Sequence, residues 1–475
     1  MSWVRGSWLM AVAVTVAFGL GSAAQADVKL PKIFGSHMVL QQKSQVSFWG
    51  WADPGEEVTV TLNGATATAK AGDDKKWSLK IATPEAGGPH QVVVKGKNEV
   101  KFDDVLIGEV WICSGQSNME WSVAQSANPA EEAKNGDHPM IRMIKVQRIP
   151  AEKPMEDING EWQAATPQTV SQFSAVGYYF ARHLQGELKV PIGMINTSWG
   201  GTICEAWTSR EALAADPDFK PILDRAAPFK PGNPNQAAAL FNGMLNPIVP
   251  FGIKGAIWYQ GESNVSRAVQ YRKLFPTMIT DWRTRFGQGD FPFLFVQLAP
   301  FRYGGNPTLL AELWEAQLKT LALPNTGMSG TTDIGNINDI HPKNKQDVGK
   351  RLALWALAKT YGKADLVYSG PLYDSMSVDG NKVKIKFQHV GGGLVARDGK
   401  PLTHFTVAGE DQQFVDATAT IEGDTVVVTS DKVAKPVAVR FGWNQLAEPN
   451  LANKEGLPAS PFRTDDFKLV SADAK

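Results

Sequence analysis

The chain is 475 residues long and carries 48 basic and 48 acidic side chains, so its formal net charge at neutral pH is zero. This balance argues against nucleic acid or an anionic membrane surface as the main binding partner, because both attract strongly basic proteins. A chain of this length exceeds one typical core, so two or three domains are expected. The 15 tryptophans are consistent with sugar binding, because an indole face stacks on a pyranose ring, although tryptophan is also common in protein cores.

The first 26 residues have the pattern of a signal peptide. Arg5 provides a positive charge, residues 8–20 are apolar, and residues 24–26 (Ala-Gln-Ala) match the small-x-small cleavage pattern. We therefore expect an exported protein, periplasmic or secreted, whose mature chain begins near Asp27. A retained membrane anchor is the alternative. No later stretch is long and apolar enough to span a bilayer, so no further contact with the membrane is expected.

The only cysteines are Cys113 and Cys204, and both lie next to the motifs described below. Export permits a disulfide. Because a disulfide requires Cα atoms closer than about 7 Å, two buried free thiols are the default expectation and a Cys113–Cys204 disulfide is the alternative.

Residues 27–104 are predicted to form an N-terminal β-sandwich module. The Asn63-Gly64 dipeptide is typical of a tight hairpin turn. Short, mostly alternating runs of apolar and polar residues, typical of half-buried strands, occupy residues 46–52, 58–62, 77–81 and 91–94. Such a module either binds carbohydrate or supports a neighbouring domain, and we favour support.

Residues 105–365 alternate between predicted strands and predicted helices, which indicates an α/β domain with a largely parallel sheet. Strands are predicted at residues 110–113, 191–196, 254–259 and 293–298, and helices at residues 174–188, 271–286, 311–321 and 345–361. Residues 366–475 return to strand patterning and are predicted to form a C-terminal β-rich module, with strands at residues 382–387, 425–429 and 438–443.

Several predicted strands end in short polar segments. Ser117 follows the strand at residues 110–113, at the carboxyl end where open α/β sheets bind their ligands, and is a candidate nucleophile. Met119 stands where the α/β-hydrolase elbow has its second glycine, so a different hydrolase fold is indicated. Two further polar segments, at residues 197–202 and 260–263, follow later strands. We therefore predict one site at the rim of the sheet.

A serine nucleophile needs a base, and the base needs an orienting group. Of the seven histidines, only His341 lies in a loop just before the last predicted helix with an acid two residues away, so it is the predicted general base. Many serine hydrolases carry the acid three residues before the histidine, where this chain has Asn338. Asp339 is the preferred acid and Asp333 the alternative. Orientation by a main-chain carbonyl also remains open.

The oxyanion of the tetrahedral intermediate needs hydrogen-bond donors. The candidates are the Ser117 backbone N–H, the backbone of Gly200 and Gly201, and the Gln260 side-chain amide. Glu262 either aligns an arginine or substrate hydroxyls, or forms a structural pair. Glu262 and Trp121 are the predicted substrate-binding residues.

Four ordered blocks resemble those of the sialate O-acetylesterases, which belong to the SGNH (GDSL-like) hydrolases. The blocks are residues 115–119 (GQSNM), 196–202 (NTSWGGT), 258–263 (WYQGES) and 340–345 (IHPKNK). The resemblance extends to residues 38–41, 49–52 and 456–464, and so covers nearly the whole mature chain. It implies a three-layer SGNH-hydrolase-like α/β domain with a mostly parallel sheet, flanked by N-terminal and C-terminal β-sandwich-like modules.

The same resemblance implies a serine esterase that uses no metal and no other cofactor. Ser117 would be the nucleophile, His341 the base, and Gly201 and Gln260 the oxyanion donors. We therefore predict an O-acetylesterase that acts on acetylated carbohydrate, either acetylated sialic acid or oligosaccharides from plant polysaccharides such as xylan or xyloglucan. One alternative is a general lipase or thioesterase, but no long apolar run near the motifs predicts an acyl-chain tunnel. The other is a sugar-binding protein without activity, which the complete set of candidate catalytic residues argues against.

Overall fold

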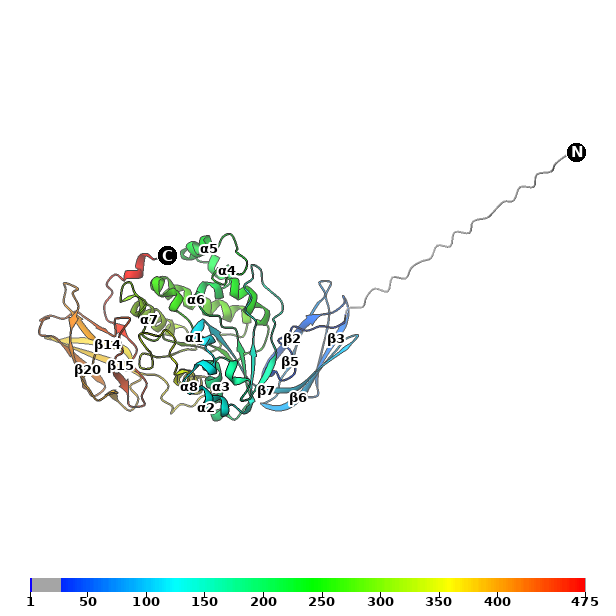
Figure 1. Cartoon of the computed structure of the whole chain (residues 1–475), viewed down its shortest axis with the longest axis horizontal. Helices are drawn as coiled ribbons and strands as arrows, with labels where there is room; N and C mark the ends of the chain where they lie inside the picture. The colour runs from blue at the N-terminus through cyan, green and yellow to red at the C-terminus, as the bar shows by residue number, and fades with distance from the viewer. Residues whose placement is uncertain (2–26, 475) are drawn as a thin grey trace.

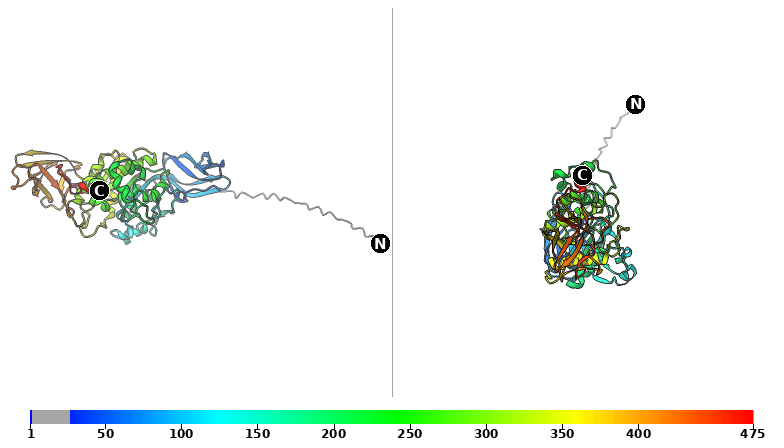
Figure 2. Two further views of the ribbon diagram at one scale, coloured as in Figure 1. Left: turned by 90° about the horizontal axis from the view of Figure 1, so that it is seen from above. Right: turned by 90° about the vertical axis from the view of Figure 1, so that its left-hand side faces the viewer.

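The structure, a computed structural model, describes residue 1 and residues 27–474, so the predicted signal peptide lies outside the described residues apart from Met1. The described chain is elongated. A central α/β region separates the N-terminal strands at one end from the C-terminal strands at the other (Figures 1 and 2). Among the described residues, no helix has the length and apolar character needed to cross a membrane.

The central sheet is built from parallel strands with one antiparallel strand at its edge. The strand order is β13-β12-β11-β7-β10-β8-β9, and only β9 runs antiparallel to its neighbour. Strands β10, β11 and β12 are buried along their whole length, as expected for a parallel sheet covered on both faces. The strands are β7 (Glu99–Gly115), β8 (His138–Lys145), β9 (Trp162–Ala165), β10 (Ile192–Asn196), β11 (Gly255–Tyr259), β12 (Phe293–Val296) and β13 (Thr326–Ser329).

Helices cover both faces of this sheet and make three layers. On one face, Trp111 of β7 packs edge-on against Phe180 of α3 (Ala175–Leu188), which itself packs on α8 (Lys345–Trp355). On the other face, Trp258 of β11 packs against Trp282 of α6 (Ala268–Phe286), which packs on α7 (Leu309–Lys319). The shorter helices are α1 (Ser117–Glu120), α2 (Pro129–Lys134), α4 (Arg210–Ala214) and α5 (Lys220–Arg225).

The remaining helical segments are three to six residues long. Two are π-helical, Phe241–Leu245 and Ala356–Thr360, and the second continues α8 to the end of the helix predicted at residues 345–361. The 3₁₀ turns are Val123–Gln125, Val170–Gln172, Cys204–Trp207, Pro217–Phe219, Asn246–Ile248, Glu262–Arg267, Thr320–Ala322 and Val470–Asp473.

The N-terminal strands belong partly to the same sheet. Strands β3, β4 and β6 join it through β7, and β1 pairs with β7 in parallel. Strands β2 and β5 form a separate antiparallel ribbon. The hairpin predicted at Asn63-Gly64 connects β3 and β4. The strands are β1 (Val39–Gln41), β2 (Gln45–Trp51), β3 (Glu57–Leu62), β4 (Ala65–Lys70), β5 (Lys76–Ala82) and β6 (Gly87–Lys95).

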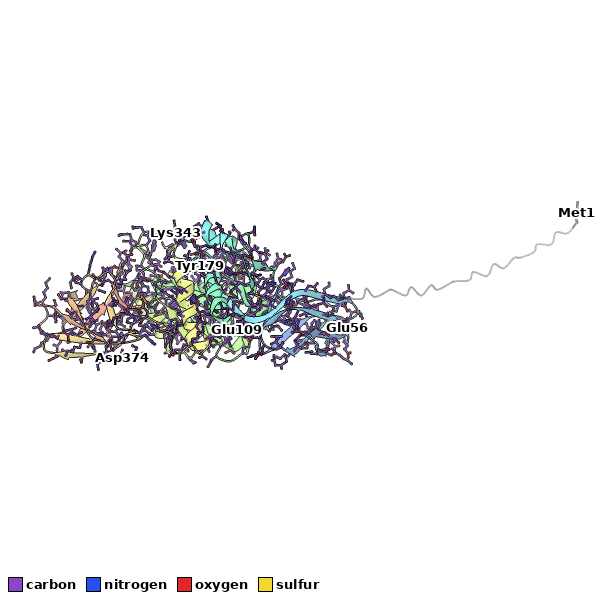
Figure 3. All side chains as sticks on the ribbon, turned by 90° about the horizontal axis from the view of Figure 1, so that it is seen from below. Met1, Glu56, Glu109, Tyr179, Lys343 and Asp374 are labelled. Carbon is purple, nitrogen blue, oxygen red and sulfur yellow. The ribbon has the colours of Figure 1, made fainter. Side chains whose placement is uncertain are left out.

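The expected domain boundary between residues 104 and 105 falls inside β7. This strand of 17 residues pairs with β6 and β1 in its first part and with β10 and β11 in its second. Figure 3 marks Glu109 on β7, between the central region and the N-terminal strands around Glu56. One hydrophobic cluster extends from Val28 to Leu357. The N-terminal strands therefore share a core with the central region rather than forming a separate sandwich.

The C-terminal strands enclose a second hydrophobic cluster and form two antiparallel sheets, β14-β15-β20-β19 and β18-β17-β21-β23, with a small pair β16-β22. The predicted fold class, α/β with a mostly parallel sheet and additional β modules, is confirmed. The strands are β14 (Leu372–Asp379), β15 (Lys382–Gln388), β16 (Leu394–Ala396), β17 (Phe405–Ala408), β18 (Val415–Asp416), β19 (Thr418–Glu422), β20 (Thr425–Thr429), β21 (Ala438–Phe441), β22 (Leu451–Asn453) and β23 (Phe462–Arg463).

Candidate active site

A glycine at the end of β7 fixes the position of Ser117. The φ of Gly115 is +133°, and a Cβ at this position would lie 2.2 Å from the carbonyl oxygen of Tyr259 on the neighbouring strand. Only glycine fits such a close approach of two strands. The Gln116 N–H donates to the same carbonyl at 2.9 Å. The chain then turns directly into α1, so Ser117 lies at the carboxyl edge of the sheet.

His341 lies against Ser117. Its Nε2 is 2.9 Å from Ser117 Oγ, although 224 residues separate the two in sequence. The histidine belongs to the loop between β13 and α8, and its side chain is mostly buried. Burial and the positive charge of Lys345 lower the pKa of His341. The imidazole is therefore neutral near pH 7 and can accept a proton from the hydroxyl.

The two candidate acids differ in their contacts. Asp339 Oδ1 accepts a hydrogen bond from the His341 backbone N–H at 3.0 Å and lies 3.8 Å from His341 Nδ1. Both carboxylate oxygens of Asp333 instead accept hydrogen bonds from Arg351 of α8, at 2.7 and 2.6 Å. The alternative that placed Asp333 beside the histidine therefore does not agree with the structure, because the guanidinium of Arg351 holds this carboxylate.

Trp121 lies on the other side of the imidazole. Its ring stacks on His341 with centroids 4.3 Å apart and planes 16° from parallel. The indole N–H donates to the Gln125 carbonyl oxygen at 2.8 Å, which fixes the ring. The sequence predicted contact between Trp121 and substrate, whereas in the structure one face of this ring covers His341.

Backbone N–H groups near Ser117 remain available for an oxyanion. Within residues 27–474, the N–H groups of Ser117 and Gly201 have no protein acceptor. Gly201 has a φ of +74°, a left-handed conformation that glycine adopts without strain. The neighbouring Gly200 packs closely on Ser117, since a Cβ on Gly200 would lie 3.3 Å from Ser117 Cβ. The Gly200 N–H itself donates to Glu120 Oε2 at 2.7 Å and is not free.

The structure contradicts the prediction that the Gln260 amide faces the oxyanion. Gln260 is completely buried. Its Nε2 donates to the Thr202 carbonyl oxygen at 3.2 Å and to Asn264 Oδ1 at 2.6 Å, and its Oε1 accepts from the Tyr271 hydroxyl at 3.1 Å. Both amide protons are thus used in holding the loops after β10 and β11 together. Gln260 supports the site from behind rather than facing substrate.

Glu262 takes part in a buried network behind the nucleophile. Its Oε1 accepts a hydrogen bond from Asn118 Nδ2 at 2.6 Å, while Oε2 is buried and has no partner among residues 27–474. Asn118 Nδ2 also donates to the Ile340 carbonyl oxygen at 2.9 Å, and Asn118 Oδ1 accepts from Lys345 Nζ. These contacts favour the structural alternative for Glu262, and its predicted contact with substrate stays a prediction.

The two charges of this network are both taken out of water. Burial raises the pKa of Glu262 and lowers the pKa of Lys345 to about 7. The Lys345 ammonium lies 5.0 Å from the centre of the Tyr259 ring. Through Asn118, the network joins the serine turn to the loop of His341. The sequence blocks contain both Asn118 and Lys345, but a single sequence gives no signal that a lysine near a histidine is buried.

A second group that sequence reasoning missed lies at the rim. Glu120 Oε1 pairs with Arg148 at 2.7 Å, while its Oε2 holds the Gly200 N–H. The Arg148 guanidinium lies 5.6 Å from the centre of the Trp199 ring. Glu120 stands in the same stretch as Ser117, and its position three residues along α1 is the only sequence signal that it faces the site.

Both cysteines are free and buried. Cys113 lies on β7 facing α3, and Cys204 Sγ lies 3.7 Å from Met278 Sδ. The default expectation of free thiols is confirmed, and a disulfide is not formed. Across residues 27–474, no group of three or more His, Cys, Asp or Glu side chains is placed to hold a metal ion.

Comparisons with known proteins agree with this geometry. The family model described as carbohydrate esterase, sialic acid-specific acetylesterase, matches residues 107–358. Human sialate O-acetylesterase is 32% identical over 416 residues, covering 76% of each protein, and the orangutan (Pongo abelii) enzyme is 30% identical over 508 residues, covering 93% of each.

Among solved structures, the carbohydrate acetylesterase XAC1771 of Xanthomonas citri superposes with a TM-score of 0.87. It is 41% identical, and the match covers 93% of this chain and 100% of that one. The chain belongs to the sialic acid-specific acetylesterase family of carbohydrate esterases.

Proposed function

We propose that this protein removes O-acetyl groups from carbohydrates through an acetyl-enzyme formed on Ser117. The observation that carries the assignment of residues is the 2.9 Å contact between Ser117 Oγ and His341 Nε2 at the carboxyl edge of the sheet. A hydroxyl in contact with a neutral imidazole is activated as a nucleophile, because the imidazole takes the proton as the oxygen attacks.

In the first half of the reaction, Ser117 Oγ attacks the acetyl carbonyl carbon and its proton passes to His341 Nε2. The carbonyl oxygen becomes an oxyanion, for which the free N–H groups of Ser117 and Gly201 are the proposed donors. The tetrahedral intermediate then collapses. The bond to the sugar oxygen breaks, and the sugar hydroxyl leaves with the proton from His341.

In the second half, His341 takes a proton from water as the water oxygen attacks the acetyl-serine. Collapse of the second tetrahedral intermediate returns the proton from His341 to Ser117 Oγ and releases acetic acid, which ionises to acetate. The imidazolium formed in both halves is stabilised by the carboxylate of Asp339, which is the proposed acid. Its distance of 3.8 Å from His341 Nδ1 needs a small side-chain rotation to become a hydrogen bond, as is common in free enzymes.

The substrate is proposed to be an acetylated sugar, either acetylated sialic acid, after the name of the curated relatives, or an acetylated oligosaccharide of plant origin. Acetate release from a panel of these compounds distinguishes them. We also propose that the chain is exported, because residues 1–26 have the charge, apolar stretch and cleavage pattern of a signal peptide. The proposed functional division is an N-terminal module up to residue 104, a catalytic region to residue 365 and a C-terminal module.

The test is direct detection of the intermediate. Mass spectrometry of a peptic digest, made after rapid acid quench of a reaction with p-nitrophenyl acetate, should show an acetyl adduct on the peptide that contains Ser117. Ser117→Ala should lose the adduct and lower kcat by a factor of at least about 10³. A neighbouring control, Ser122→Ala, should keep both. Undiminished turnover by Ser117→Ala, or an adduct on another residue, would contradict the assignment.

A further inference from the structure

A cleft at the junction of the N-terminal ribbon and the central region is distant from Ser117. Its volume is about 540 Å³, within the range of about 300–1,000 Å³ typical of small-molecule sites. One wall is the outer face of the ribbon of β2 and β5, and the other consists of residues 155–156 and 246–250. In Figure 1 this ribbon lies at one end of the molecule, whereas α1 lies in the central region.

Sequence alternation places two tryptophans on the wall of this cleft. Along β2, Val46, Phe48 and Gly50 are buried, whereas Trp49 and Trp51 point to the opposite face and are partly exposed. Trp49 is fixed by edge-on packing against Phe34, with ring centroids 4.7 Å apart. Trp51 is not part of the hydrophobic core, so its ring is free to contact a ligand.

The polar groups beside these rings are unoccupied. In the antiparallel register, Ser78 is opposite Trp49 and Lys76 is opposite Trp51. Within the described part of the chain, the indole N–H groups of Trp49 and Trp51 and the hydroxyls of Ser47 and Ser78 have no hydrogen-bond partner in the protein and face solvent at least in part. An indole face with donors and hydroxyls around it matches a sugar ring, which presents apolar C–H groups on its faces and hydroxyls at its edge.

One ion pair connects the two walls of the cleft. Lys76 of β5 forms an ion pair with Glu156 on the opposite wall, and Asn246 Nδ2 donates to the Met155 carbonyl oxygen at 2.9 Å. The charged groups that line it are Asp74, Lys76 and Glu156, which sum to one negative charge. An anionic sugar such as sialic acid is therefore disfavoured, and a neutral sugar is preferred.

We propose that this cleft is a second carbohydrate site, which binds neutral oligosaccharide without cleaving it. Trp51 provides the stacking face, and Ser47, Ser78 and the two indole N–H groups bind hydroxyls. The site would hold a polymeric or branched substrate near the enzyme between successive deacetylations. It assigns to the N-terminal module a binding role in place of the purely supporting role expected from sequence.

The test is isothermal titration of the Ser117→Ala protein, which cannot turn over substrate, with xylohexaose, cellohexaose and, as the anionic comparison, sialyllactose. We expect saturable binding of at least one neutral hexasaccharide and none of sialyllactose. Adding Trp51→Ala should weaken that binding by about tenfold or more, since tenfold corresponds to about 1.4 kcal/mol. Trp51→Phe, which keeps a ring, should retain most of it. Gln45→Ala, on the same strand outside the cleft, should bind as the parent does.

Three outcomes would overturn the proposal. These are absence of binding by both neutral hexasaccharides, unchanged binding in Trp51→Ala, or tighter binding of sialyllactose. Circular dichroism and the thermal unfolding midpoint show whether each variant is folded. Because Ser117 is replaced throughout, failure of this test leaves the esterase assignment standing, and failure of the esterase assignment leaves this binding measurement intact.

Discussion

The indole of Trp121 stacks on the imidazole of His341, with ring centroids 4.3 Å apart. The histidine is therefore held on three sides: by Trp121 on one face, by the Ser117 hydroxyl at Nε2 and by Asp339 at its backbone N–H. An imidazole fixed in this way keeps the nucleophile–base geometry without help from substrate. The Trp121 ring also accounts for much of the burial that lowers the pKa of His341.

Trp121→Ala should lower kcat by about tenfold or more, because small misplacements of a catalytic group are costly. It should also open His341 to water and so raise its pKa. The neutral imidazole is the active form, so kcat/KM falls as pH drops through that pKa, and the acidic limb of the profile should move to higher pH. Trp121→Phe should preserve the position of the limb. The measurement is the pH dependence of kcat/KM with p-nitrophenyl acetate, and an unshifted limb in Trp121→Ala would refute the positioning role.

Lys345→Met should move the acidic limb in the same direction for a different reason. The positive charge of Lys345 lowers the pKa of His341, so its removal should raise that pKa. With its pKa lowered to about 7, Lys345 carries its charge over the acidic range in which His341 titrates. Lys343→Met is the matched control, because Lys343 is exposed and lies two residues before Lys345, in the loop that leads into α8. Equal shifts in both variants, or none in Lys345→Met, would exclude this electrostatic role.

Much of the site follows from the sequence because polar residues at strand ends must meet at one edge of a parallel sheet. Ser117, the glycine pair and the loop of His341 are brought together in this way. The orientation of Gln260 does not follow, because only the packing of Tyr271, Thr202 and Asn264 around its amide decides that it faces inward. The residues at one strand end do not show whether a polar side chain there is buried or faces the substrate.

In the fold as well, single strands and helices could be predicted from the sequence, whereas the way they join into one sheet could not. The central region is predicted well, because its strands are short continuous apolar runs and its helices repeat apolar residues at helical spacing. The expected boundary at residue 104 falls inside a strand, because β7 has a half-exposed first part and a fully buried second part. The change in pattern resembles a domain boundary in sequence, whereas in space one strand simply passes from the edge of the molecule into a covered sheet.

Asp339→Asn and Asp333→Asn should have different effects. Asp339 carries the negative charge that raises the pKa of His341, so Asp339→Asn should move the acidic limb to lower pH and lower kcat by about tenfold. Asp333 is nearly buried against Arg351, and breaking such a pair costs about 3 kcal/mol of stability. Asp333→Asn should therefore lower the thermal midpoint but keep kcat below it. Kinetics with parallel thermal unfolding check both, and a severe loss of kcat in a folded Asp333→Asn protein would make Asp333 the acid.

Glu120 should act through the Gly200–Gly201 backbone rather than on substrate. Its Oε2 holds the Gly200 N–H at 2.7 Å, and this bond fixes the direction of the next N–H, that of Gly201. Glu120→Ala should free this segment and lower kcat by about tenfold, less than the factor of about 10²–10³ that complete loss of an oxyanion donor costs. Glu120→Gln still offers an oxygen acceptor, so kcat should stay within about threefold of wild type, although the ion pair with Arg148 is lost.

Arg148→Gln separates the two contacts of Glu120, because it removes the ion pair and leaves the hydrogen bond to the Gly200 N–H. If Arg148→Gln lowers kcat as much as Glu120→Ala does, the ion pair rather than the backbone bond positions the donor.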